Sequence, residues 1–473
     1  MTAQLLHRLE DRLLRTKLGA RKGLVRASLE GAFAEPSCPL CRLLLRQEER
    51  WLTVLLAESV VDLGIRRRIL ASWGFCRRHA WAMASRSDLG GPLATAIIYE
   101  SLSSLLLEHC EVSAGSQNGR DPITPGRPER LDDAVPGHAC PACHARAETE
   151  RNYVDSFIRY CALDGFVRLY QTSDGLCVHH LGQALASARP RVWSMLLADK
   201  AAKIEASLQV EAIPSRPPQY TMEAPPEVGH RLGLLQGPLP FFPGSLDHVR
   251  YSYPFARVWK LDSGQGDACT ACARERAVEQ QQLDALLAPE ALNDDGDLWL
   301  CPEHAWKLHA AAIRRFRPAN IDHWSRRWAL AVKNELRTLA SGAELAARVR
   351  FQSWHDARRR LPIAAATAHS CALCAAQVNV RDSWISETIS TLTHADPGRG
   401  LPNMCLPHAQ ALLESAPHPE AAIVRRQQLV RLQRLQEELA LYIHKVNWDH
   451  RDEPWGPERD SWWRIVRFFA GNE

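Results

Sequence analysis

Twelve of the fourteen cysteines in this 473-residue chain follow a pattern that occurs four times. Each copy has a Cys-x-x-Cys motif, here called the Cys-Cys pair, and 28 to 34 residues later a Cys-x-x-His motif, here called the Cys-His pair. The copies are Cys38, Cys41, Cys76 and His79; Cys140, Cys143, Cys177 and His180; Cys269, Cys272, Cys301 and His304; and Cys371, Cys374, Cys405 and His408. Three thiolates and one imidazole are the ligand set of a tetrahedral structural zinc site. We therefore predict four Cys3His metal sites, each closed by the two pairs of one copy.

The ligand set favours four Zn2+ ions, because each predicted site has four protein ligands and no open position. Iron–sulfur clusters at the same ligands are the alternative, since cysteine thiolates hold such clusters and histidine replaces cysteine in some of them. The chain would then serve an oxidoreductase as an electron carrier. A thioredoxin-like dithiol is disfavoured, because no βαβ pattern surrounds any Cys-Cys pair.

Other residues near the pairs have less specific interpretations. We expect the two remaining cysteines, Cys110 and Cys161, to be buried structural thiols. Three histidines stand next to cysteines or next to a predicted ligand and could substitute for one: His109, His144 and His179. The constant two-residue gap inside every Cys-His pair argues against substitution. Four tryptophans flank the pairs and are expected to shield the metal sites from water: Trp73, Trp81, Trp299 and Trp306.

The four copies have a higher order. Their first cysteines stand at 38, 140, 269 and 371, so two steps of 102 residues flank one of 129. Copies one and three share a Trp two residues after the ligand His, whereas copies two and four share a Leu five residues after it. This ABAB order predicts two homologous lobes of two modules each. The predicted ranges are 1–112 for module 1, 138–210 for module 2, 211–250 for a linker, 251–345 for module 3, and 346–473 for module 4 with a C-terminal helical tail.

Helical periodicity dominates the segments between the pairs. Leu432, Leu435, Leu439 and Tyr442 form one apolar stripe, and strand-type alternation is scarce throughout. We predict an all-α fold in which each module has a helix leaving the Cys-Cys pair, a second beginning at the Cys-His pair, and a longer third. The prolines crowded into 211–250 predict an extended linker without a helix.

The C-terminal tail has its own pattern. Asp460 is placed to cap a short helix whose apolar face contains Trp462, Ile465, Val466 and Phe469. Trp463 and Phe468 fall off that face. They either pack beside the helix within the same chain or form a surface for a partner.

Charge and hydropathy limit the compartment and the partners. No apolar run approaches the length that spans a bilayer, and the leucines of residues 5–14 are interrupted by charges, unlike a secretory signal. We therefore expect a cytoplasmic protein with reduced thiols. The formal charge of +4 falls to zero once twelve thiolates and four Zn2+ ions are counted, which weakens the case for nucleic-acid binding.

Several segments resemble a known family. They are Cys-Pro-Leu-Cys at 38–41, Gly-Phe-Cys-Arg-Arg-His-Ala-Trp at 74–81, Ala-Ile-Ile-Tyr-Glu at 96–100, and the tail from His450 to Trp462. The resemblance is to an uncharacterised prokaryotic family, catalogued as a domain of unknown function. It implies a prokaryotic origin and the metal-binding pairs, and it implies no activity.

These observations favour a non-enzymatic function. No glycine-rich phosphate loop, nucleophile elbow or His-Glu-x-x-His helix occurs in the chain. We expect a zinc-binding helical scaffold or adaptor that acts through contacts with a partner protein. The alternatives are the iron–sulfur electron carrier and, because of arginine clusters such as 66–68, a nucleic-acid-binding regulator.

Overall fold

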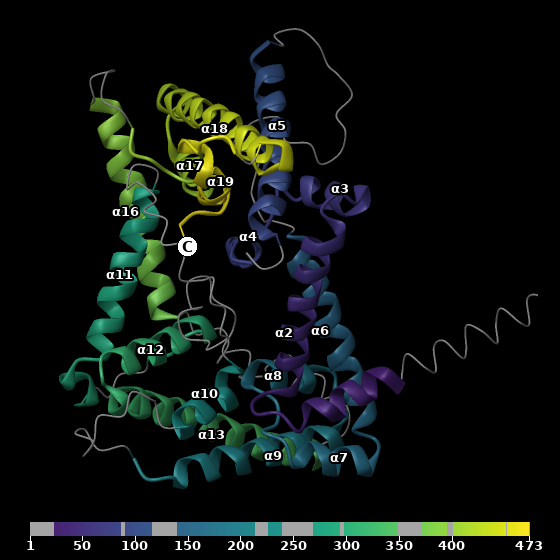
Figure 1. Cartoon of the computed structure of the whole chain (residues 1–473). Helices are drawn as coiled ribbons and strands as arrows, with labels where there is room; N and C mark the ends of the chain where they lie inside the picture. Colours follow the sequence, from purple (N-terminus) through teal and green to yellow (C-terminus); the bar gives the residue numbers. More distant parts are fainter. Residues whose placement is uncertain are drawn as a thin grey trace, which may run out of the picture. The chain divides into compact units, whose positions relative to one another are not determined.

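Helices and no strands make up the regular structure that the computed structural model describes (Figure 1). The described residues are 23–86, 90–115, 140–212, 226–238, 268–293, 298–348, 371–394, 401–450 and 452–472. The predicted all-α fold is confirmed. Residues 5–14 lie outside the described residues, as do residues 213–225 and 239–250 of the predicted linker.

Each Cys-Cys pair opens a helix. These helices are α2 (Pro39–Val54), α6 (Pro141–Tyr160), α11 (Thr270–Leu286) and α16 (Ala372–His394). In all four, the first cysteine of the pair directly precedes the first helical residue, and the second cysteine lies within the first turn. Two soft ligands therefore meet at one helix N-terminus, where the helix dipole favours the thiolate form.

Each Cys-His pair also opens a helix, as predicted. These helices are α4 (Arg77–Ala84), α8 (Val178–Ser187), α12 (Pro302–Arg314) and α17 (Leu406–Ser415). The cysteine takes the N-cap position with extended backbone angles, for example φ −62° and ψ 162° at Cys76. The histidine is the third helical residue, so the two side chains of the pair come together.

The longer third helices are α5 (Gly91–Gly115), α9 (Pro190–Gln209), α13 (Pro318–Arg348) and α18 (His418–Val446). Shorter helices connect α2 to α4 and α6 to α8: α3 (Leu63–Ala71) and α7 (Asp164–Gln171). A π-helical turn, η1 (Leu55–Ser59), continues α2, and a 3-10 helix, η6 (Pro289–Asn293), follows α11. Two further 3-10 turns, η7 (Trp448–His450) and η8 (Pro457–Asp460), precede the last helix.

The described residues divide into two compact units that interleave along the chain. Unit 1 takes its residues from 1–47, 146–240 and 281–374, and unit 2 takes its residues from 48–145, 241–280 and 375–473. Each unit thus draws on both halves of the sequence, whereas the predicted modules are consecutive ranges. The residues of α2, α6, α11 and α16 are shared between the units.

Unit 1 contains a helix where the sequence predicts none. Helix α10 (Pro226–Gln236) lies in the proline-rich segment and packs against α9 and α13 (Figure 1). The segment can hold a helix because Pro226 occupies the first helical position, where the missing N–H is not needed, and no proline follows until after the helix. Arg231 of α10 is buried and forms an ion pair of 2.7 Å with Asp322 of α13.

Unit 2 is built around α5, α18 and the last helix, α19 (Ser461–Ala470), which contact one another (Figure 1). Ile465, Val466 and Phe469 of α19 are buried as the periodicity predicts, and Phe468 is buried as well. Trp463 packs against Trp81 with ring centroids 4.4 Å apart. The tail therefore docks within its own unit. Asp460 stands at the N-cap but makes no capping hydrogen bond; its carboxylate accepts one from Arg464 instead.

No helix within the described part of the chain combines the length and the apolar character that crossing a membrane requires.

Candidate metal sites

All sixteen predicted ligands lie in four groups of three cysteines and one histidine. In each group the four ligand atoms lie within 4.8 Å of one another. Site 1 is Cys38, Cys41, Cys177 and His180; site 2 is Cys76, His79, Cys140 and Cys143; site 3 is Cys269, Cys272, Cys405 and His408; site 4 is Cys301, His304, Cys371 and Cys374. Sites 1 and 4 belong to unit 1, and sites 2 and 3 belong to unit 2.

The predicted pairing of the motifs is wrong. Each site takes its Cys-Cys pair from one module and its Cys-His pair from the other module of the same lobe. Helix length explains why. Helix α2 has 16 residues and carries the chain about 24 Å from Cys38. Only the nine-residue α3 precedes the Cys-His pair at Cys76, and this is too short to bring that pair back.

The spacing of the ligand atoms fits a single tetrahedral ion. The Sγ–Sγ distances between the two pairs of a site are 3.6–3.8 Å, and the distances from histidine Nδ1 to the sulfurs are 3.1–3.6 Å. With Zn–S bonds of about 2.3 Å, a tetrahedral ion places its sulfurs about 3.8 Å apart. In all four sites Nδ1 is the nitrogen that faces the sulfurs.

The three closely spaced cysteines of a site oppose one another's ionisation, so the site favours a bound cation. In site 4, hydrogen bonding to Cys301 lowers the pKa of Cys371 to about 3, whereas burial and the nearby Cys371 raise the pKa of Cys374 to about 11. In site 2, hydrogen bonds with Cys143 and Cys76 lower the pKa of Cys140. Hydrogen bonds with Cys140 and Cys143 raise the pKa of Cys76. One thiolate thus opposes ionisation of the next. A bound divalent cation removes this conflict and stabilises all three thiolates together.

A carboxylate faces the outer nitrogen of three of the ligand histidines. Nε2 lies 3.0 Å from the carboxylate of Glu48 at His79, of Glu150 at His180, and of Glu275 at His408. Burial lowers the pKa of His79, but hydrogen bonds with Cys140, Cys143 and Glu48 outweigh it and raise the pKa to about 11. A carboxylate at Nε2 holds the imidazole with Nδ1 toward the sulfurs and increases its basicity as a ligand.

Two of these carboxylates stand at the same distance in sequence from their Cys-Cys pairs, a signal that the sequence analysis above does not use. Glu48 and Glu150 each stand seven residues after the second cysteine of a Cys-Cys pair, and the third copy has Glu279 at this offset, which is not the carboxylate at His408. The fourth copy has Arg381 at this offset. Site 3 is supported differently, by Glu275, which stands three residues after Cys272 and one turn along α11.

Two glycines cover the sulfurs of sites 1 and 3. Gly237 follows α10 with φ +82°, and a Cβ there would lie 2.8 Å from Sγ of Cys41. Gly471 follows α19 with φ +84°, and a Cβ there would lie 3.1 Å from Sγ of Cys272. Both positions need glycine for the left-handed backbone and for the close approach to sulfur.

The tryptophans that follow two of the ligand histidines donate hydrogen bonds to the carbonyl oxygens of these glycines. Trp306 donates from Nε1 to the carbonyl oxygen of Gly237 over 3.3 Å, and Trp81 donates to Gly471 over 3.2 Å. Each tryptophan stands two residues after the histidine of one site and fixes the cover of the other site in the same unit. The other two tryptophans that were expected to shield the metal sites pack within the protein. Trp73 is buried, and Trp299 packs against Trp328.

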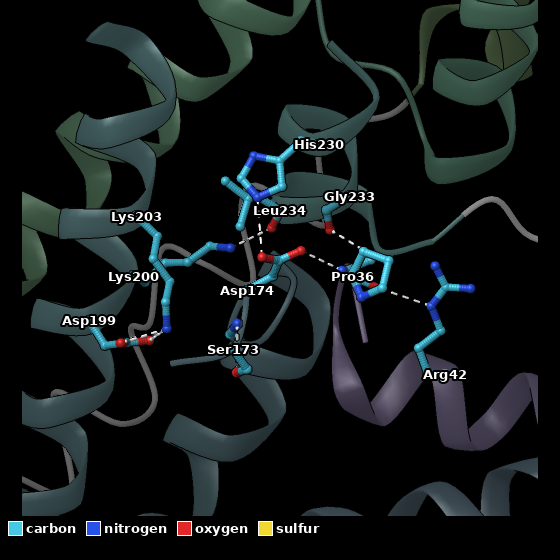
Figure 2. A network of polar contacts seen from close by, with 12 residues as sticks. Pro36, Arg42, Ser173, Asp174, Asp199, Lys200, Lys203, His230, Gly233 and Leu234 are labelled. Atoms are coloured by element: carbon cyan, nitrogen blue, oxygen red, sulfur yellow. Dashed lines mark hydrogen bonds and ion pairs between the residues drawn. The ribbon is translucent and has the colours of Figure 1, made fainter. Parts of the chain in front are cut away.

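A polar network positions the start of α2 beside site 1. Ser37, with φ 77°, precedes Cys38, and its N–H donates to the carboxylate of Asp174. Figure 2 shows this carboxylate between His230 and the loop at Pro36, with His230 Nε2 3.2 Å from Asp174 Oδ1. The adjoining cavity of about 220 Å³ is smaller than the 300–1,000 Å³ usual for ligand pockets, so we assign the network to placing the Cys-Cys pair.

A buried lysine links α9 to α10 in the same region. Lys200 of α9 donates to the carbonyl oxygen of Leu234 in α10 (Figure 2). Burial lowers the pKa of Lys200 to about 8.

The alternative ligands do not enter the four groups. His144 is exposed, and His179 lies 3.0 Å from Glu150 rather than against the sulfurs. Cys161 is buried, and burial raises its pKa to about 12. The side chains of His109 and Cys110 lie outside the described residues.

Comparison with known proteins places the chain in a family. Residues 24–205 and 260–473 match DUF6062, described as a family of unknown function. The chain belongs to this family. The two matched regions correspond to the two lobes of the repeat, and the resemblance inferred from the sequence to an uncharacterised family is confirmed. No curated protein and no solved structure matches the chain.

Proposed function

We propose that this member of DUF6062 binds four structural zinc ions and acts as a helical scaffold that presents its surface to a partner protein. The observation that supports this most strongly is the closed set of three cysteines and one histidine at each site, with Nδ1 and all three sulfurs within 4.8 Å of one another. A site with four protein ligands has no position left for substrate.

The ions would act as crosslinks between helix starts. Site 2 joins the N-terminus of α4 to that of α6, although Cys76 and Cys143 are 67 residues apart. Site 3 joins α11 to α17 across 133 residues, from Cys272 to Cys405. Structural zinc contributes an apparent ~10–16 kcal/mol in small peptides at neutral pH, so four such crosslinks would dominate the stability of the fold.

The short distances between sulfurs support zinc over an iron–sulfur cluster. A cluster places several irons and sulfides between its cysteines and therefore holds the thiolates farther apart than one ion does. Sulfurs separated by 3.6–3.8 Å fit around one ion. We therefore favour a mononuclear centre.

The scaffold role draws support from the outer face of α18. Ile423, Val430 and Leu441 are 50%, 60% and 49% exposed. Steps of seven and eleven residues put all three on one line along the helix. An apolar line on the exposed side of a long helix suits a partner that presents an apolar helix face of its own.

Metal analysis tests the proposal. Protein purified without chelators should contain four zinc ions per chain and be colourless. Replacing zinc by Co2+ should give the intense visible bands of tetrahedral cobalt thiolate centres. A brown protein that contains iron and acid-labile sulfide would refute zinc and favour the electron carrier, and protein that neither contains nor takes up metal would refute both.

A further inference from the structure

The four sites fall into two classes by the exposure of their sulfurs. Sites 2 and 4 each contain one exposed cysteine, Cys143 and Cys374 respectively. In site 3 all four ligands are buried, and in site 1 only Cys41 is even partly accessible. Each compact unit thus has one covered site and one open site.

The glycine cover accounts for this difference. Gly237 lies against the sulfurs of Cys41 and Cys177, and Gly471 lies against those of Cys272 and Cys405. In site 3 the chain closes further, because the Asn472 side chain accepts from the N–H of Cys269 and donates to its carbonyl oxygen. No described glycine stands as close to a sulfur of site 2 or site 4.

The accessible sulfurs of the open sites lie next to each other. In site 2, Sγ of the exposed Cys143 is 3.6 Å from Sγ of Cys76, which is partly exposed. In site 4, Sγ of the exposed Cys374 is 3.8 Å from Sγ of Cys301, which is also partly exposed. The third cysteine of each site, Cys140 or Cys371, is buried. The two sulfurs that a solute can reach are therefore the two that could join.

We propose that sites 2 and 4 are oxidation-sensitive metal centres, in which hydrogen peroxide joins Cys76 to Cys143 and Cys301 to Cys374 and releases the ion. Sites 1 and 3 keep their ions under the same conditions. This inference rests on the proposed zinc binding and adds a reactive role for half of the sites.

The chemistry balances with peroxide as the only oxidant. The thiolate of Cys143 attacks one peroxide oxygen, the O–O bond breaks, and a sulfenic acid and hydroxide form. The thiolate of Cys76 then attacks the sulfenic sulfur, the S–S bond forms, and the second oxygen leaves as hydroxide. Two protons convert both hydroxides to water. Peroxide gains the two electrons that the thiolates lose, and the ion leaves because two of its four ligands are gone.

The test exposes the zinc-loaded full chain to increasing hydrogen peroxide with a chromogenic zinc chelator present. We expect two of the four ions to be released at least tenfold faster than the other two. Mass spectrometry of proteolytic peptides should then show the Cys76–Cys143 and Cys301–Cys374 disulfides, with the cysteines of sites 1 and 3 still reduced. Release of all four ions at one rate, or first oxidation in sites 1 and 3, would overturn the inference.

Two glycine variants test the cover directly. In Gly471→Ala the added Cβ displaces the chain from site 3, so a third ion should become releasable by peroxide, and Gly237→Ala should do the same at site 1. Gly229→Ala is the matched control, because a Cβ at that position of α10 meets nothing within 4 Å. A normal two-ion release in both cover variants would refute the role of the glycines. Wild-type protein without metal would refute the proposed function, whereas four ions that leave together would refute only this inference.

Discussion

Trp81 donates a hydrogen bond to the carbonyl oxygen of Gly471 over 3.2 Å, although the two residues are 390 positions apart in the chain. Trp81 follows the histidine of site 2, and Gly471 covers site 3. Trp306 and Gly237 repeat this relationship between sites 4 and 1. In each compact unit, a hydrogen bond therefore links the helix that begins at the open site to the glycine that covers the covered site.

Removing the indole donor should loosen the cover of site 3. We expect Trp81→Phe to lower the free energy of unfolding by about 1–3 kcal/mol, because the buried carbonyl of Gly471 loses its partner. One of the four ions should also pass to a chelator several-fold faster than in wild type. Timed zinc release measures this, with Trp455→Phe, a substitution of an exposed tryptophan, as control. Unchanged release from all four sites would show that the hydrogen bond does not hold the cover.

Each carboxylate at Nε2 of a ligand histidine should increase the zinc affinity of its own site. Glu150→Gln weakens the acceptor at Nε2 of His180, so site 1 should bind its ion about 10–100-fold more weakly. Competition with a chelator of known affinity measures the change. Glu148→Gln, at an exposed position of the same helix, is the control. Equal affinities in the two variants would contradict this role for Glu150.

Lys200 gives a pH dependence with a definite sign. Burial lowers its pKa to about 8 from an ordinary value of 10.5. Between these two values the unfolded chain binds a proton at this lysine and the folded chain does not, so its contribution to stability rises with pH and is lost as pH falls toward 8. From pH 8 to 9.5 we expect wild type to gain about 1–2 kcal/mol relative to Lys200→Met. Urea unfolding of both proteins at the two pH values measures the difference, and parallel curves would contradict the prediction.

The C-terminal helix should stabilise its own unit. Phe468 is fully buried, so Phe468→Ala should cost about 3–5 kcal/mol of unfolding free energy. The oligomeric state should not change, because the side chain contacts the core of its own chain. Denaturant unfolding and light scattering measure the two quantities. Loss of a complex without loss of stability would instead indicate a partner surface.

Local chemistry explains what could be predicted from the sequence. The ligand types, their spacing, and the helix that starts at each pair all depend on short segments such as Cys76 to His79. The pairing depends on where long helices end. All four Cys-Cys pairs are chemically equivalent, so nothing in the motif at Cys38 distinguishes His79 from His180 as its partner.

The glycine covers and helix α10 could not be predicted from the sequence for a similar reason. Gly237 and Gly471 bear no chemistry of their own, and their role depends on α10 and α19 docking against distant helices. Helix α10 lies in a proline-rich segment that suggests extended chain. It persists because Val228, Leu232 and Leu235 are buried against its neighbours, and tertiary packing of an apolar face outweighs weak local propensity.

Counting metal ions in two double variants tests whether the Cys-Cys and Cys-His pairs of neighbouring modules exchange to form the sites. Cys76 and Cys140 belong to one site, whereas Cys38 and Cys76 belong to two. Cys76→Ala with Cys140→Ala should therefore leave three ions per chain, and Cys38→Ala with Cys76→Ala should leave two. The reverse result, two ions in the first variant and three in the second, would show instead that each module closes its own site.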